Sequence, residues 1–166
     1  SESRAAVAGG VTSFMEMPNT NPPATTIELL EQKYAIAAET SVVNYSFFLG
    51  TTNNNLDELL KSNYKEISGI KIFMGSSTGN LLVDNEQTLD KIFANAPALI
   101  ATHCEDEKTI LDNLYRYKEK YGENITPEMH PLIRNAEGCY ISSSKAISLA
   151  KKHNTRLHIL HISTAI

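Results

Sequence analysis

The sequence predicts an α/β fold built on a parallel β-sheet. Short apolar runs alternate along the chain with longer segments in which apolar residues recur at helical spacing. Parallel strands must be joined by a crossover, usually a helix, and each interval between runs is long enough to hold one. No internal repeat, linker or low-complexity tract divides the sequence, so residues 1–166 are expected to form a single domain.

Five apolar runs are expected to form the strands. They are short, and turn-forming residues lie between them and the helical segments. The first run ends in the segment 18–23, whose prolines exclude a helix or an inner strand. The runs are 11–17, 43–49, 69–74, 98–103 and 156–161.

Helix signals occupy the intervals between these runs. Two longer helices are expected at 106–121 and 133–153, separated by the segment 122–131, where glycine, asparagine and two prolines break the helical pattern. Three other helices begin with a capping box, in which a polar residue is followed three residues later by Glu or Gln. The pairs are Thr25 with Glu28, Asn55 with Glu58, and Asp84 with Gln87.

Two parallel-sheet architectures are consistent with this order, the doubly wound sheet and the (β/α)8 barrel. A doubly wound sheet usually carries a glycine-rich phosphate loop, and the sequence has neither GxGxxG nor GKS/T. A barrel collects functional residues from the ends of many strands, and the polar candidates here come from at least four. Five strands cannot close a barrel of eight, for which about 250 residues are typical. The sequence therefore predicts a segment of a (β/α)8 barrel.

Lys71 and two histidines are the candidate functional residues. Lys71 lies inside the apolar run 69–74, where a charged side chain is costly unless it is paired or neutralised. His103 and His161 each end a later apolar run, where a parallel strand reaches its carboxyl end. The three residues together predict a metal site spread over three strands. Singly, a lysine of this kind is as readily a snorkelling or salt-bridged residue, and each histidine an ordinary core residue.

His158 and His161 belong to the same predicted strand. They are three positions apart and are therefore expected to face opposite sides of the sheet. His161 is the expected ligand because it is closer to the carboxyl end of the strand, where barrel sites lie. His158 is expected to lie under a helix with a satisfied hydrogen bond.

Composition and charge exclude several other functions. A net charge of −4 with dispersed lysines and arginines is not the footprint of a nucleic-acid-binding protein. The apolar runs are far shorter than the roughly 20 residues that cross a bilayer, and the segment 1–10 lacks the features of a signal peptide. No membrane association and a cytoplasmic location are therefore expected. Cys104 and Cys139 have no CxxC spacing and are expected to be reduced thiols.

Four segments together resemble a known family. The segment 9–23, GGVTSFMEMPNTNPP, resembles the GGxT…MPNTxPP segment of dihydroorotases, which belong to the amidohydrolase superfamily of metal-dependent (β/α)8 barrels. The segments 69–74, 101–105 and 158–163 then resemble, in order, the family's lysine strand, its AxHxE strand and its HxxHxS strand. The resemblance covers essentially the whole chain and implies that it corresponds to about strands 2 to 6 of the barrel.

The resemblance implies a role for each candidate residue. Lys71 would be carboxylated on Nζ by carbon dioxide, which turns a buried cation into an anionic ligand that bridges two zinc ions. His103 and His161 would bind one of these ions through neutral imidazole nitrogens. Asn19 matches the family asparagine that holds the substrate carboxylate, although an asparagine beside proline also serves a turn.

The activity implied by the resemblance is the reversible hydrolysis of the cyclic amide of L-dihydroorotate to N-carbamoyl-L-aspartate in pyrimidine biosynthesis, by a homodimer. Family members also carry an HxH pair, an arginine that grips the substrate and a proton-shuttling aspartate, and none of these has a match here. We therefore expect no proton-shuttle residue in this segment and no activity from it alone. Two alternatives stay open: a sister cyclic amidase, such as an allantoinase or hydantoinase, and a non-catalytic dihydroorotase-like subunit that supports a partner such as aspartate transcarbamoylase.

Overall fold

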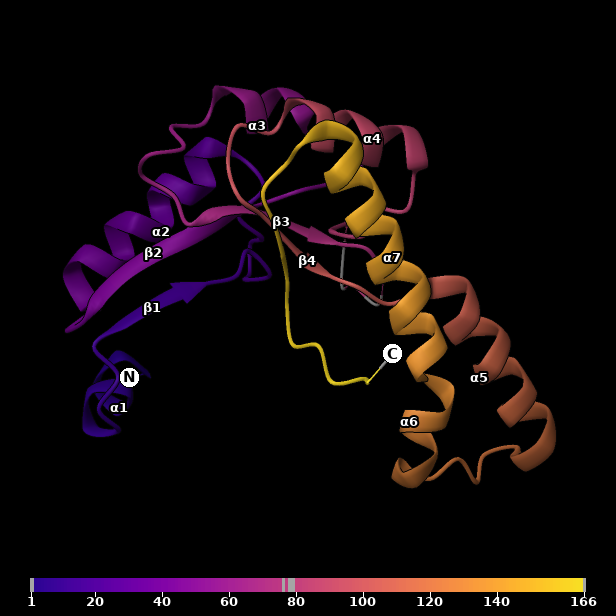
Figure 1. Cartoon of the computed structure of the whole chain (residues 1–166). Helices are drawn as coiled ribbons and strands as arrows, with labels where there is room; N and C mark the ends of the chain where they lie inside the picture. The colour runs from indigo at the N-terminus through magenta and orange to yellow at the C-terminus, as the bar shows by residue number, and fades with distance from the viewer. Residues whose placement is uncertain (1, 76, 78–79, 166) are drawn as a thin grey trace.

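The chain forms a parallel sheet whose strands lie side by side in the order of the sequence. The computed structural model describes residues 2–75, 77 and 80–165. Within these residues each strand pairs in parallel with the next, in the order β1-β2-β3-β4-β5 (Figure 1). The strands are β1 (Ser13–Glu16), β2 (Asn44–Gly50), β3 (Gly69–Phe73), β4 (Ile100–His103) and β5 (Leu157–Ile159). All five predicted runs are confirmed as strands, with ends that differ by at most two residues.

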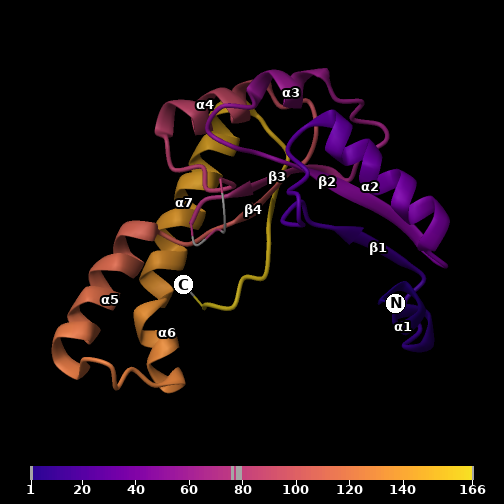
Figure 2. The same cartoon turned by 180° about the vertical axis from the view of Figure 1, so that it is seen from behind.

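The helices that connect the strands lie along one side of the sheet. Figures 1 and 2 show α2, α3, α4 and α7 on the convex side of the curved sheet, with α5 and α6 extending beyond its end. Helices on one side of a sheet with sequential strand order are typical of a (β/α)8 barrel, whereas a doubly wound sheet has helices on both faces. The predicted barrel segment is therefore confirmed. The helices are α1 (Glu2–Ala8), α2 (Ile27–Thr40), α3 (Leu56–Lys61), α4 (Glu86–Asn95), α5 (Glu107–Tyr121), α6 (His130–Ile133) and α7 (Ala136–His153), with a short 3-10 helix (Pro127–Met129) before α6.

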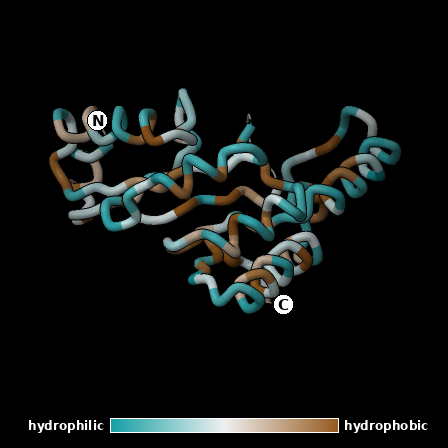
Figure 3. The backbone as a smooth tube through the Cα atoms, turned by 90° about the horizontal axis from the view of Figure 1, so that it is seen from above, coloured by the Kyte–Doolittle hydropathy of each residue, from teal (hydrophilic) through white to brown (hydrophobic). Residues whose placement is uncertain are grey.

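The hydrophobic core lies between the sheet and these helices. Ile70 and Ile72 of β3 and Ile100 of β4 are fully buried, and they belong to one cluster with Leu89 and Phe93 of α4. Figure 3 shows hydrophobic stretches along the strands and a more hydrophilic outer layer. Of the helices that the structure describes, none has the length and apolar character to span a membrane.

Two of the three capping-box predictions are wrong by one residue. Helix α2 is capped by Thr26 rather than Thr25, and α4 by Asn85 rather than Asp84. Both observed caps have extended backbone, and their side-chain oxygens accept a hydrogen bond from the amide three residues on. Because neighbouring polar residues satisfy nearly the same spacing, backbone conformation decides which of them caps the helix.

Asn55 precedes α3 as predicted, but its side chain does not cap that helix. Its Oδ1 accepts from the amide of Thr52 at 2.7 Å, and its Nδ2 donates to the carbonyls of Thr25 at 2.8 Å and Gly50 at 2.9 Å. These bonds join the loop after β2 to the segment before α2. Contacts between distant segments therefore replaced the local cap.

The last long helix begins later than predicted. Helix α7 starts at Ala136 after the N-cap Asn135, whose Oδ1 accepts from the amide of Gly138 at 3.0 Å. The expected first residue, Ile133, instead ends α6, and Arg134 leaves the helical conformation with φ −98° and ψ 73°. The break between α6 and α7 therefore lies inside the predicted helix and places Arg134 at the junction.

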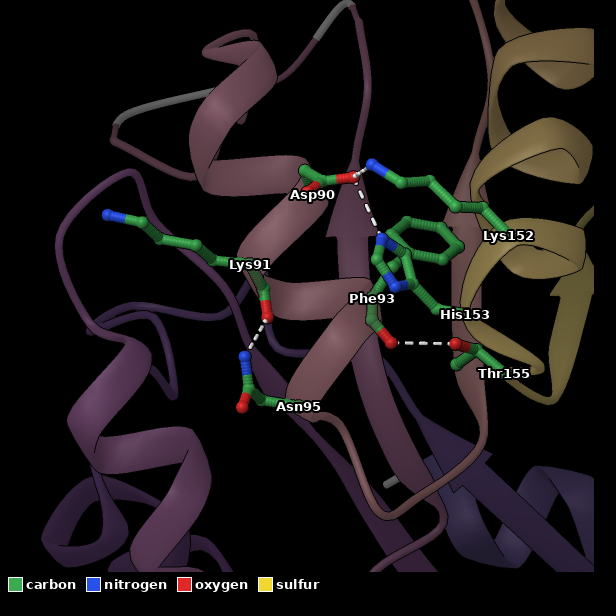
Figure 4. Close-up of polar contacts among 7 residues, drawn as sticks. All are labelled: Asp90, Lys91, Phe93, Asn95, Lys152, His153 and Thr155. Atoms are coloured by element: carbon green, nitrogen blue, oxygen red, sulfur yellow. Dashed lines mark hydrogen bonds and ion pairs between the residues drawn. The ribbon is translucent and has the colours of Figure 1, made fainter.

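Helix α4 is joined to α7 and to the segment that follows it by the contacts in Figure 4. Asp90 Oδ1 accepts hydrogen bonds from Lys152 Nζ at 2.6 Å and His153 Nε2 at 2.8 Å. Thr155 Oγ1 donates to the carbonyl of Phe93 at 2.6 Å. The hydrogen bonds from His153 and Lys152 lower the pKa of the Asp90 carboxyl. Asp90 thus couples two helices of the outer layer.

Replacement of Asp90 by asparagine is expected to lower the melting temperature at neutral pH. A carboxyl whose pKa is lowered in the folded state contributes stability above its unfolded pKa, about 3.9, and this contribution is lost as the pH falls through the lower folded value. The difference in melting temperature between wild type and Asp90→Asn should therefore shrink in acid. Thermal unfolding followed by circular dichroism at a series of pH values measures it. Asp112→Asn is the control, because the exposed Asp112 forms an ion pair with Lys108 of its own helix.

Candidate metal centre

Lys71 is buried at the centre of the sheet. Its side chain is 1 % exposed, and Nζ has no hydrogen-bond partner among the residues that the structure describes. In register it lies between Gly50 of β2 and Ala101 of β4, two small residues that leave space on this face. The opposite face of β3 carries Ile70 and Ile72, which pack into the core under the helices. Lys71 therefore points to the concave side of the sheet, which is the interior side of a barrel.

Burial changes the proton affinity of this lysine. Desolvation lowers the pKa of Lys71 to about 7, although the nearby Cys104 thiol opposes the change. A large fraction of the amine is therefore neutral at neutral pH, and the neutral amine is the form that can combine with carbon dioxide. A buried Nζ that has no hydrogen-bond partner among the described residues and is readily deprotonated fits the carbamate that the family resemblance implies for Lys71.

His103 and His161 face each other at the carboxyl edge of the sheet. His103 ends β4, His161 follows β5, and His103 Nδ1 lies 3.0 Å from His161 Nε2. Two nitrogens bound to one tetrahedral zinc ion, at about 2.0–2.1 Å each, are about 3.3 Å apart. The observed separation is close to that value. Burial lowers the pKa of His103, although the neighbouring Glu105 carboxylate opposes the change, so the neutral imidazole that metals require is favoured.

The backbone at His161 explains how this residue reaches His103. Leu157 and Ile159 of β5 pack against the core, so strict alternation would point residue 161 toward the helices as well. His161 instead has φ +38°, in the left-handed region that non-glycine residues rarely adopt. This conformation ends the alternation and directs the imidazole to the other side.

The position predicted for His158 is wrong. His158 pairs in register with Ala101, the neighbour of Lys71, and its side chain is exposed rather than covered by a helix. It therefore lies on the same face of the sheet as Lys71. The prediction assumed that His161 continues the strand, whereas β5 ends at Ile159.

Asn19 lies in the loop that crosses the carboxyl end of β2. The side chain is exposed, and the preceding residue, Pro18, is buried against Gly50. A Cβ added at Gly50 would lie 2.8 Å from the Cβ of Pro18, so only glycine allows this approach. Because Gly50 is the register neighbour of Lys71, the loop that carries Asn19 lies at the same edge of the sheet as the candidate ligands. Its substrate-binding role stays a prediction.

Two charged residues extend the site beyond the predicted ligands. Glu105 Oε2 lies 3.1 Å from His103 Nε2 and 2.5 Å from Arg134 Nη2. The AxHxE pattern includes Glu105, whereas no sequence signal identified Arg134. Among the described residues, no group of three or more His, Cys, Asp or Glu is placed to hold a metal ion.

Comparisons with known proteins agree with this barrel segment. No family model matches the chain. It is 32 % identical over 166 residues to a dihydroorotase of Methanosarcina acetivorans, covering 96 % of this chain and 34 % of that protein. An allantoinase of Streptomyces avermitilis is 29 % identical and is matched over 98 % of this chain and 36 % of its own length. The chain thus spans about a third of the curated relatives it matches.

A solved structure shows the same arrangement of elements. The L-hydantoinase of Arthrobacter aurescens superposes with a TM-score of 0.89 at 26 % identity, over 97 % of this chain and 36 % of that one. Dihydroorotases, allantoinases and hydantoinases are all hydrolases of cyclic amides. The agreement in sequence and in fold extends over nearly every residue of the chain, which is similar throughout to a segment of cyclic amidohydrolases of the amidohydrolase superfamily.

Proposed function

We propose that the protein containing this chain is a dihydroorotase that hydrolyses its cyclic amide with two zinc ions. The observation that carries the proposal is that the buried Lys71 amine of β3, which has no hydrogen-bond partner among the described residues, lies on the same side of the sheet as the facing nitrogens of His103, at the end of β4, and His161, after β5. The name of the 32 % identical archaeal relative and the MPNT segment favour dihydroorotate as the substrate.

Each residue has a defined task in this proposal. A carboxylated Lys71 would help to hold the zinc through its carbamate oxygens, and His103 and His161 would each hold it through a neutral imidazole nitrogen. Bound zinc supplies Lewis acidity, which lowers the pKa of water and polarises the amide carbonyl. Asn19 donates its side-chain amide to the substrate carboxylate. The family resemblance implies further ligands and a proton-shuttling aspartate that have no match among residues 1–166, so we expect no turnover from this segment alone.

Two measurements on the complete protein test the proposal. Elemental analysis should find one to two zinc ions per site, and kcat/KM should be higher for dihydroorotate than for allantoin or hydantoin. The names of the allantoinase and hydantoinase relatives support a second candidate, a sister cyclic amidase. Preference for allantoin or hydantoin would establish that candidate instead. A protein without metal and without turnover would support the non-catalytic subunit, against which the presence of Lys71, His103 and His161 argues.

Replacement of Asn19 by alanine is expected to raise KM for dihydroorotate on the order of 10- to 100-fold, with a smaller change in kcat. A hydrogen bond to a charged group contributes about 1.5–3 kcal/mol, which corresponds to that range. Steady-state kinetics with dihydroorotate measure the effect. Asn54→Ala, an exposed asparagine in the loop after β2, is the matched control. An unchanged KM in Asn19→Ala would mean that Asn19 only stabilises the turn and does not bind the substrate.

The oligomeric state, location and partners of the enzyme are also part of the proposal. We expect a homodimer, as the family resemblance implies, in the cytoplasm and without membrane association. Nucleic-acid binding is not expected, because the net charge is −4 and the cationic residues are dispersed. Sedimentation of the complete protein measures the oligomeric state.

A further inference from the structure

We propose that Glu105 and Arg134 form a positioning pair that sets the orientation and tautomer of His103 for metal binding. The inference rests on the proposed function, because it concerns how one ligand of that site is held. Neither residue is assigned to the metal itself. The pair acts through His103.

One carboxylate oxygen joins the two partners. Glu105 Oε2 accepts from His103 Nε2 at 3.1 Å and from Arg134 Nη2 at 2.5 Å. A neutral imidazole has one N–H, and donation from Nε2 leaves the lone pair on Nδ1. That Nδ1 is the atom that faces His161 Nε2 at 3.0 Å. The contact with Glu105 therefore selects the tautomer whose free nitrogen points into the candidate metal site.

The backbone around Glu105 is held in place by β3. A Cβ added at Gly75 would lie 1.9 Å from the carbonyl oxygen of Glu105, so the segment after β4 packs directly on the end of β3. Only glycine permits this approach. The carboxylate therefore starts from a fixed point beside His103.

Arg134 is positioned by the break between α6 and α7. Asn113 Nδ2 of α5 donates to the carbonyl of Ile133 at 3.0 Å, and the amide of Asp106 donates to the carbonyl of Gly138 at 3.0 Å. These bonds fasten the junction to the segment that follows β4. Arg134 then supplies a positive charge to the carboxylate and fixes the oxygen that His103 uses, which keeps Glu105 directed at the imidazole rather than at the ions.

A positioning pair and a purely structural ion pair differ in the effects expected when they are removed. The side chains of Glu105 and Arg134 are 22 % and 29 % exposed, and partly exposed ion pairs contribute little to folding stability. Partners that orient a metal-binding histidine typically alter metal affinity 10- to 100-fold. The positioning role therefore predicts a large loss of metal affinity with little change in melting temperature.

The test measures zinc affinity of the complete protein by competition with a chelator, together with the visible spectrum of the cobalt(II)-substituted form. Glu105→Gln is expected to weaken zinc binding about 10- to 100-fold. Arg134→Met should weaken it less, and the double variant should be no weaker than Glu105→Gln, because Arg134 acts through Glu105. Arg134→Lys should restore part of the affinity. Lys145→Met, which breaks the ion pair of α7 with Glu86, is the matched control.

Several results would overturn the inference. Zinc affinity and a cobalt spectrum unchanged in Glu105→Gln would remove the positioning role, as would an equal loss in Lys145→Met. If Glu105→Gln does not fold, Arg134→Met and Arg134→Lys test the inference instead. Zinc affinity equal to that of the wild type in both variants would contradict the positioning role. A wild-type protein that binds no zinc overturns the proposed function itself, which distinguishes that failure from a failure of the pair.

Discussion

Replacement of Lys71 by alanine in the complete protein is expected to abolish the bridged metal site and to lower kcat at least about 1,000-fold. Loss of a bridging ligand removes several kcal/mol of transition-state stabilisation, and about 4 kcal/mol corresponds to that factor. The carboxylate of Glu105 lies beside His103, but its Oε2 is already bonded to His103 Nε2 at 3.1 Å and to Arg134 Nη2 at 2.5 Å, so it is not free to replace Lys71. Elemental analysis and steady-state kinetics with dihydroorotate measure the two effects.

The lysine carbamate has a direct spectroscopic test. Protein equilibrated with isotopically labelled bicarbonate should show a carbamate carbon signal in the wild type and none in Lys71→Ala. Lys33→Ala is the control, because Lys33 is a largely buried lysine of α2 whose Nζ already pairs with Glu16 at 2.9 Å. Wild-type turnover and metal content in Lys71→Ala would contradict the role of Lys71.

The second large effect concerns stability without metal and carbon dioxide. Under these conditions Lys71→Met is expected to unfold at higher denaturant concentration than the wild type. The difference between an ordinary lysine pKa near 10.5 and the folded value of about 7 corresponds to ~4–5 kcal/mol of unfavourable burial at low pH. Methionine is similar in length and removes that cost. Urea unfolding of the two metal-free proteins measures the difference.

The stability difference between Lys71→Met and the wild type is expected to change with pH in a defined direction. Between about pH 7 and pH 10.5 the unfolded chain holds a proton on Lys71 that the folded chain has released, so stability rises with pH by up to about 1.4 kcal/mol per pH unit. The advantage of Lys71→Met should therefore be full below pH 7 and should shrink as the pH rises. Lys61→Met is the control, because Lys61 is exposed beside Glu58. A Lys71→Met protein less stable than wild type at every pH would contradict the prediction.

The candidate site was only partly predictable from the sequence. Lys71 stood out because a charge inside an apolar run is rare, and His103 because it ends an apolar run, where a parallel strand reaches its carboxyl end. His158 was placed on the wrong face, since a three-residue spacing indicates opposite faces only while the strand stays extended. The left-handed backbone of His161 violates that condition, and nothing in the residue type signals it.

Helix boundaries show the same limit. Spacing located the helices that carry capping boxes, but Thr26 and Asn85 took the caps predicted for their neighbours. The side-chain amide of Asn55 bonds instead to the end of β2, to its own loop and to the segment before α2, and the last of these contacts is not contained in any local pattern.

By itself the sequence determined the parallel α/β fold, the barrel segment and the strands that carry Lys71, His103 and His161, because hydrophobic spacing and strand ends are properties of short segments. Only the tertiary structure decided which atoms meet. The contacts of His103 with His161 and of Glu105 with Arg134 join residues 58 and 29 positions apart. The pKa of Lys71 likewise depends on burial by neighbouring strands. Desolvation and hydrogen-bond geometry arise from the packing of distant segments, so they are set when the sheet and its connecting helices assemble.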